Sequence, residues 1–161
     1  MHLELLLTSR RLIDERKGGG QASLMDLRRA VSSAYYALFH FVAQSCTDVF
    51  LPTSQKSLSR AKRQAYRSID HRDVRNACVL TKDIKYGSPH GIREFADAFL
   101  LMNKHREQAD YDISPGGDFH PKQARYLIDT CELAIEHFAS ADIDDRRAFA
   151  VQVCLKSKSR A

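Results

Sequence analysis

The sequence predicts an all-α protein, an antiparallel up-and-down bundle of four to five main helices followed by a short C-terminal extension. Apolar residues recur at helical spacing over several long segments, and short segments containing Gly or Pro separate them. A chain of 161 residues, 43% hydrophobic and 28% charged, can form one domain with a sizeable core. We expect the bundle to span residues 1–140 and the extension to span residues 141–161.

The first two helices are predicted on either side of a glycine run. Leu3, Leu6, Leu7 and Ile13 give the first segment one apolar face, and glycines 18–20 end it. A second helix is expected from near Ser23, whose spacing to Asp26 is typical of a capping box, to about Thr47. Residues 34–43, AYYALFHFVA, are apolar nearly all round, which indicates a central helix packed on several sides.

A third helix is predicted over residues 53–70, with a possible resumption over residues 73–80. It carries two stripes at helical spacing. The apolar stripe consists of Leu58, Ala61, Ala65 and Ile69, and the basic stripe on another face consists of Lys56, Arg60, Arg63 and Arg67. Cations one turn apart suit successive phosphates of a nucleic acid, although a solvated helix face has the same pattern.

A fourth helix is expected after Pro89, ending in HREQADYD at residues 105–112. Beyond the loop SPGGD, Asp118 can cap a fifth helix that has Pro121 in its first turn and runs to about Phe138. The tail is ambiguous. Residues 144–156 fit a short helix, but Phe149, Val151, Val153 and Leu155 alternate as in a strand.

The net charge of +5 is concentrated in one segment. Residues 56–85 hold nine lysines and arginines against three aspartates, a net of +6, whereas the rest of the chain sums to −1. This pattern is typical of a surface patch that meets a polyanion. No apolar run is long enough for a membrane span, and the first residues do not resemble a signal peptide, so we expect a cytoplasmic protein without membrane contact.

Metal and covalent chemistry have no sequence support. The four cysteines are scattered without a C-x-x-C pair, which predicts free thiols rather than a zinc site or a disulfide framework. There is no H-E-x-x-H and no Glu-x-x-His of a di-iron bundle, so neither a metal site nor a cofactor is predicted.

Two polar constellations are candidates for a site. The first is a ribbon along one face of the second helix, which either lines a cleft or interface or forms an internal network: Arg29, Ser33, Tyr36, His40 and Gln44. The second is HREQADYD, where Asp110 lies one turn after Arg106 and can orient its guanidinium. His105 lies about 100° from Arg106, so the group is either an anion-binding pair beside a proton-transfer residue or an ordinary ion pair.

LRRAVSSAYYALFH at residues 27–40 and HREQADYD at residues 105–112 together resemble the HEPN superfamily of small helical bundles. The resemblance covers the chain from the first helix to about Phe138. It implies a HEPN-like bundle that forms a two-fold homodimer with a cleft at the interface. Many HEPN proteins are metal-independent endoribonucleases of toxin–antitoxin or defence systems, often paired with a nucleotidyltransferase-like protein.

The resemblance implies roles for individual residues. Arg106 would bind phosphate, Asp110 would orient it, and His105 or His40 would supply acid–base capacity. Arg29, Tyr36 and Tyr111 are candidates for substrate binding, and the basic stripe for RNA binding.

In the family's catalytic motif, an arginine is followed by a histidine, with four to six residues between them. Here the positions that correspond to it hold Tyr111, Asp112 and Ile113. Two functions therefore remain open: an RNA-associated protein with endoribonuclease activity, or a non-catalytic dimeric module that binds a nucleotide-like ligand or a nucleotidyltransferase-type partner protein.

Overall fold

The computed structural model describes residues 1–14, 20–51, 59–81, 90–112 and 119–155. These residues form seven helices and contain no strand, which confirms the all-α prediction. The helices are α1 His2–Asp14, α2 Leu24–Phe50, α3 Ser59–Ser68, α4 His71–Leu80, α5 His90–Tyr111, α6 Pro121–Ser140 and α7 Ile143–Cys154.

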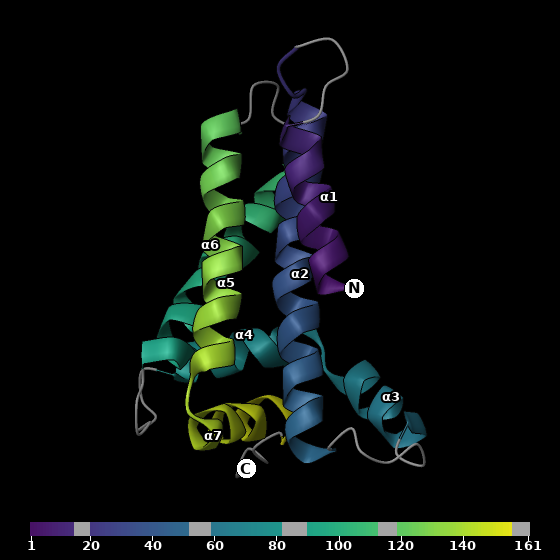
Figure 1. The fold of residues 1–161 in the computed structure, drawn as a ribbon, viewed down its shortest axis with the longest axis vertical. Coiled ribbons are helices and arrows are strands. Elements are labelled where there is room, and N and C mark those ends of the chain that lie inside the picture. Colours follow the sequence, from purple (N-terminus) through teal and green to yellow (C-terminus); the bar gives the residue numbers. More distant parts are fainter. Residues whose placement is uncertain (15–19, 52–58, 82–89, 113–118, 156–161) are drawn as a thin grey trace.

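Three of the longer helices, α1, α5 and α6, pack around α2. α1, α2 and α6 run along the long axis of the molecule with α5 behind α6, while α4 and α7 lie across one end and α3 projects from the side (Figure 1). α2 contacts α1, α5, α6 and α7. This central position explains why the segment 34–43 is apolar nearly all round.

The start of α2 has the predicted capping box. The Ser23 hydroxyl accepts a hydrogen bond from the Asp26 backbone N–H at 3.1 Å, and the Asp26 carboxylate accepts one from the Ser23 N–H at 3.2 Å. Two of the unpaired donors at the helix start are thereby satisfied. The helix ends at Phe50, three residues beyond the predicted end.

The third predicted segment is two helices, and its second part begins earlier than predicted. Asp70 caps α4 by accepting from the Asp73 N–H at 2.8 Å, so the helix starts at His71 rather than at residue 73. Of the predicted apolar stripe, Ile69 is buried but Ala61 is exposed, and Leu58 lies outside the described residues. The stripe prediction is therefore wrong at Ala61, and Tyr66 packs against the core instead.

The start of α6 differs from the prediction in its cap. His120 is the N-cap residue and makes no side-chain capping hydrogen bond, while Pro121 occupies the first turn as expected. Asp118, which we expected to cap the helix, lies outside the described residues.

Residues 143–154 form helix α7, so the strand alternative for the tail is wrong. Phe149 and Val153, four residues apart, are buried, whereas Val151 and Leu155 are 37% and 61% exposed. That spacing is the period of a helix packed along one face, and the Asp142 carboxylate caps it by accepting from the Asp144 N–H at 2.8 Å. α7 packs on α2, α4 and α5, and its Phe149 is part of the common core.

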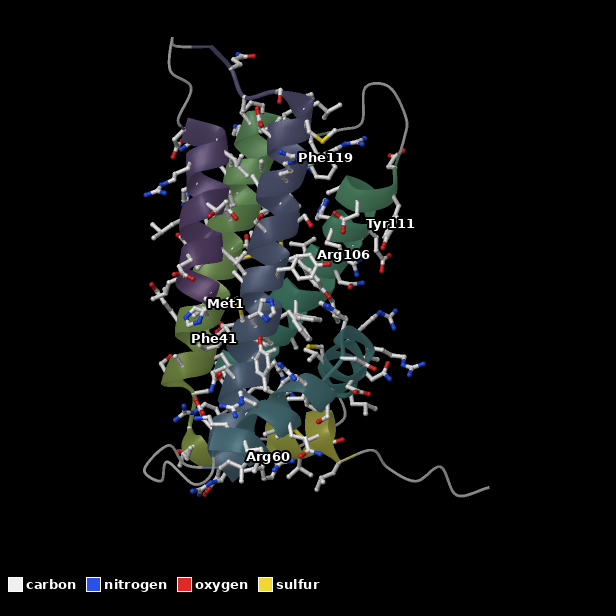
Figure 2. The ribbon with its side chains drawn as sticks, turned by 90° about the vertical axis from the view of Figure 1, so that its right-hand side faces the viewer. Met1, Phe41, Arg60, Arg106, Tyr111 and Phe119 are labelled. Atoms are coloured by element: carbon white, nitrogen blue, oxygen red, sulfur yellow. The ribbon has the colours of Figure 1, made fainter. Side chains whose placement is uncertain are left out.

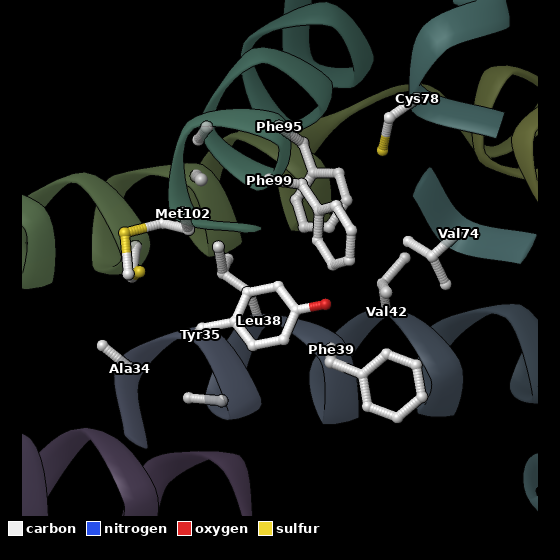
Figure 3. Packing of buried hydrophobic residues seen from close by; sticks show 14 of the residues in the cluster. Ala34, Tyr35, Leu38, Phe39, Val42, Val74, Cys78, Phe95, Phe99 and Met102 are labelled. Atoms are coloured by element: carbon white, nitrogen blue, oxygen red, sulfur yellow. The ribbon is translucent and has the colours of Figure 1, made fainter. Parts of the chain in front are cut away.

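The core is built from aromatic residues of three helices and the buried face of α2. Phe95, fully buried, lies 4.9 Å from Phe138 and 6.0 Å from both Phe99 and Phe149, measured between ring centroids. Figure 3 shows Tyr35, Leu38 and Val42 of α2 facing Phe95 and Phe99 of α5. All four cysteines are free thiols, as predicted.

Candidate functional site

A groove of about 640 Å³ runs along α2 between α1 and the C-terminal end of α5. Its lining residues are Leu5, Thr8 and Leu12 of α1, Met25, Arg28, Arg29, Ser32, Ser33, Tyr36 and His40 of α2, and Ala109 and Asp110 of α5. Its volume is within the range of ligand-binding clefts, and its lining combines apolar side chains with arginine, serine and histidine side chains.

The polar ribbon of α2 forms one side of this groove. Arg29, Ser33, Tyr36 and His40 all line it. Gln44, the last member of the ribbon, lies beyond them, where its side-chain amide donates to the Asp48 carboxylate at 2.9 Å. The ribbon thus lines a cleft over four of its five residues instead of forming an internal network.

Arg28 brings an unsatisfied donor to the same groove. Its Nε is buried, and within the described part of the chain it has no hydrogen-bond partner. Leaving a buried donor unpaired costs about 1–3 kcal/mol, which a ligand oxygen could recover. The groove thus has one donor that an acceptor atom of a ligand could satisfy.

His40 combines access to the groove with a fixed ring. Its Nδ1 is hydrogen-bonded to the Tyr66 hydroxyl of α3, and its ring stacks near Tyr36 with centroids 6.4 Å apart. Burial lowers the pKa of His40 below its ordinary value of 6.5, so the ring is neutral at pH 7 and can accept a proton.

A second histidine, His71 of α4, lies behind the groove in an aromatic cluster with Tyr35 and Phe39. The His71 Nδ1 and the Tyr35 hydroxyl are 2.8 Å apart, and the ring stacks on Phe39 at 3.8 Å. Burial, and then the charges of Arg106 and His40, lower the pKa of His71. Burial also raises the pKa of Tyr35 to about 12, so both groups are neutral at pH 7.

The sequence interpretation included neither His71 nor Tyr66. The Asp70 to Asp73 spacing is an N-cap signature that could have placed His71 at the start of a helix. No sequence signal indicates that this helix start lies against Tyr35, because the two residues are 36 positions apart.

Arg106 is packed between aromatic rings. Its guanidinium carbon lies 5.0 Å from the centroid of Tyr35 and 6.0 Å from that of Tyr111, and one nitrogen is 3.7 Å from the Asp110 carboxylate. Figure 2 shows Arg106 and Tyr111 on the same helix, α5. The Arg106 side chain is only 14% exposed and does not line the groove, whereas Asp110 does.

His105 and Tyr111, two other candidates on α5, do not line the groove. The His105 ring packs edge-on against Phe119 with centroids 6.5 Å apart, and burial lowers its pKa. Tyr111, at the helix end, is 72% exposed. The structure thus brings Arg106, Asp110, Tyr36 and His40 to one region and separates His105 from them.

The basic stripe is a surface feature of α3. Arg60, Arg63 and Arg67 are exposed, and Figure 2 shows Arg60 near the end of the molecule away from Phe119. Lys56 lies outside the described residues. The hydrogen bond between Tyr66 and His40 joins α3 to a residue that lines the groove.

No group of three or more His, Cys, Asp and Glu side chains among the described residues is arranged to hold a metal ion. No helix in the described ranges has the length and apolar character needed to cross a bilayer.

Comparison of the chain with protein-family models, with curated proteins and with solved structures found no match. The resemblance to the HEPN superfamily therefore depends on the two motifs in α2 and α5.

Proposed function

We propose that this chain is a HEPN-like, RNA-associated protein that binds single-stranded RNA along the α2 groove. The observation that carries the proposal is the composition of the groove: two arginines, one with an unpaired buried donor, beside Tyr36 and His40. Single-stranded nucleic acid is bound in this way, by cations that track the backbone and aromatic rings that stack on bases.

The exposed arginines of α3 extend the same binding path. Among the described residues, no ion pair involves Arg60, Arg63 or Arg67, which leaves their charges to act on a polyanion. Their neighbour Lys62 is different, because its ammonium pairs with Asp48 of α2. In this proposal the RNA backbone passes from Arg29 along the groove to His40 and onto α3.

The proposal includes metal-independent cleavage at His40. The neutral imidazole would accept the proton of a ribose 2′-hydroxyl as that oxygen attacks phosphorus, and the P–O5′ bond would break with water protonating O5′. Tyr66 holds the ring, and Asp110, which lines the groove, pairs with Arg106. Because the Arg106 side chain is only 14% exposed, its main role in this proposal is to position Asp110 and Tyr35.

The test measures binding and cleavage separately. Fluorescein-labelled single-stranded RNA is titrated with the wild type and with the variants Arg29→Gln and Tyr36→Leu. The matched control is Lys122→Gln, at an exposed position of α6. Arg29→Gln and Tyr36→Leu are each expected to weaken binding by about fivefold to a hundredfold, and the control to leave it unchanged. Wild-type affinity in both groove variants would refute the proposed path.

Cleavage is followed on a denaturing gel in the presence of EDTA. Wild-type protein is expected to cut the RNA, and His40→Ala to bind it without cutting. Binding without cleavage by the wild type would leave the RNA-binding proposal in place and refute the catalytic role of His40.

The non-catalytic alternative has one observation in its favour, the apolar wall formed by Leu5, Leu12 and Met25. Such a wall suits the base of a single nucleotide-like ligand, or a side chain of a nucleotidyltransferase-type partner protein. Calorimetry with AMP distinguishes the alternatives. Saturable binding of AMP by a protein that does not retain RNA would favour the module.

We also propose the homodimer that the resemblance implies. Leu3 and Leu7 of α1 are 62% and 57% exposed, Met1 just before the helix is 62% exposed, and a second copy would cover all three. Light scattering after gel filtration is expected to give twice the monomer mass for the wild type and the monomer mass for the Leu3→Ser, Leu7→Ser double variant. A monomeric wild type would refute this.

A further inference from the structure

A second groove, separate from the first, lies between α4 and α7 at the end of the molecule where these two helices cross the bundle (Figure 1). Its volume is about 580 Å³. The lining residues are Arg72, Asp73, Arg75, Asn76, Ala77, Val79 and Leu80 of α4, and Gln152, Val153 and Leu155 at the end of α7. It shares no residue with the α2 groove.

Large aliphatic side chains are exposed along this second groove. Val79 is 48%, Leu80 44% and Leu155 61% exposed, while Val153 is buried at its base. The three exposed residues lie together in one groove rather than singly over the surface. Clustered exposed apolar residues beside polar ones are a mark of protein interaction sites.

The polar part of the groove is basic. Arg75 is exposed, and the Arg72 side chain is 77% exposed, with its guanidinium 4.0 Å from the Asp70 carboxylate. The single carboxylate in the lining, Asp73, is used in the cap of α4, where it accepts from the Asp70 N–H at 3.4 Å. Arg72 and Arg75 are one turn apart and so present two guanidinium groups on neighbouring surface.

We propose that the α4–α7 groove binds an acidic amphipathic helix of a partner protein. The aliphatic residues of such a helix would cover Val79, Leu80 and Leu155, and its carboxylates would pair with Arg72 and Arg75. Helix-in-groove binding uses this combination of apolar anchors and complementary rim charges.

Other occupants fit the groove less well. RNA would find two arginines but aliphatic side chains where stacking surfaces are needed. The chain's own last six residues, KSKSRA, carry three basic side chains and would be repelled by the arginines. A second copy could offer the three acids of α6, but Asp129 and Glu132 are already bound by Arg10, which leaves Glu136 to face two arginines.

The experiment uses two fluorescein-labelled peptides of about four helical turns with identical leucine spacing, one carrying glutamates and the other lysines. They are titrated with the full-length wild type, with the Arg72→Glu, Arg75→Glu double variant, and with Leu80→Ser. Lys122→Glu, an exposed charge reversal on α6 at the other end of the bundle, is the control.

The expected result is binding of the glutamate peptide by the wild type and the control, weakened about tenfold or more in the double variant and in Leu80→Ser. Circular dichroism establishes that the variants are folded. If the double variant does not fold, Leu80→Ser and the decrease of wild-type affinity with salt decide the matter. Equal binding of the lysine peptide, or no binding of the glutamate peptide by the wild type, would overturn the proposal.

Discussion

Removing the arginine face of α3 gives the sharpest prediction about RNA binding. The change is the triple substitution Arg60→Gln, Arg63→Gln, Arg67→Gln. All three side chains are exposed, and Lys62, which anchors α3 to Asp48, is left in place. The hydrogen bond between Tyr66 and His40 is also retained, so α3 should keep its position.

The size of the effect follows from counterion release. Each phosphate contact on a single strand contributes about 0.7 to the slope of log affinity against log salt, so three contacts contribute about 2. Between about 50 and 200 mM salt, a difference of about 2 in slope corresponds to about a 16-fold larger loss of affinity for the wild type than for the variant.

The assay is fluorescence anisotropy with single-stranded RNA at several KCl concentrations. The matched control removes three exposed cations elsewhere, by glutamine substitution at Arg93, Lys104 and Lys122. The control has the same net charge as the variant, so a general effect of charge would change both slopes equally.

A slope reduced by about 2 in the α3 variant, and by much less in the control, supports direct phosphate contacts. Equal slopes in the wild type and the α3 variant would refute the reasoning, because they would show that the arginine face is solvated while RNA is bound. A lower affinity with an unchanged slope would refute it as well.

Three predictions concern stability. Gly91→Ala is expected to lower Tm, because the new Cβ would lie 2.5 Å from the His137 carbonyl oxygen. Overpacking costs about 1–3 kcal/mol, which exceeds the gain of at most about 1 kcal/mol from the higher helix propensity of alanine. An unchanged Tm would contradict the close approach of α5 and α6 at this position. Phe95→Ala, at a fully buried position, should reduce the free energy of unfolding by about 3–5 kcal/mol in urea titrations, and a loss below about 1 kcal/mol would count against the aromatic core. Since the pKa values of His40 and His71 are lowered, the unfolded chain binds more protons below about pH 6.5, so stability should fall as pH decreases from about 7 to 5. Tm measured across this range tests it, and a rise in Tm toward pH 5 would exclude the neutral, buried state of these rings.

Local features of the fold were predictable where neighbouring residues decide them. The Ser23–Asp26 capping box and the all-round apolar character of residues 34–43 placed α2 correctly. The tail was ambiguous because its apolar residues fit two periods, and packing of Phe149 and Val153 on the core selects the helix. Ala61 was misplaced because a small side chain at helical spacing does not show which face of a short helix meets the core.

The candidate site shows the same division. The spacing of Arg29, Ser33, Tyr36 and His40 sufficed to put them on one helix face, because that face is a property of a single helix. The sequence pattern did not distinguish His105 from Arg106 as a site residue. In the structure His105 packs against Phe119, whereas Arg106 packs against Tyr35 of α2. Which side faces the groove depends on helix packing, which local spacing does not determine.

The sequence by itself determined that the chain is helical, where most of its helices lie, and that positive charge is concentrated in residues 56–85. These are consequences of local periodicity and composition. Only the tertiary structure decided that the ribbon of α2 lines a groove, that His71 meets Tyr35 beside Arg106, and that α4 and α7 form a second groove. Contacts between residues so far apart in the chain depend on how several helices share one core, because each helix must bury its apolar face against the others.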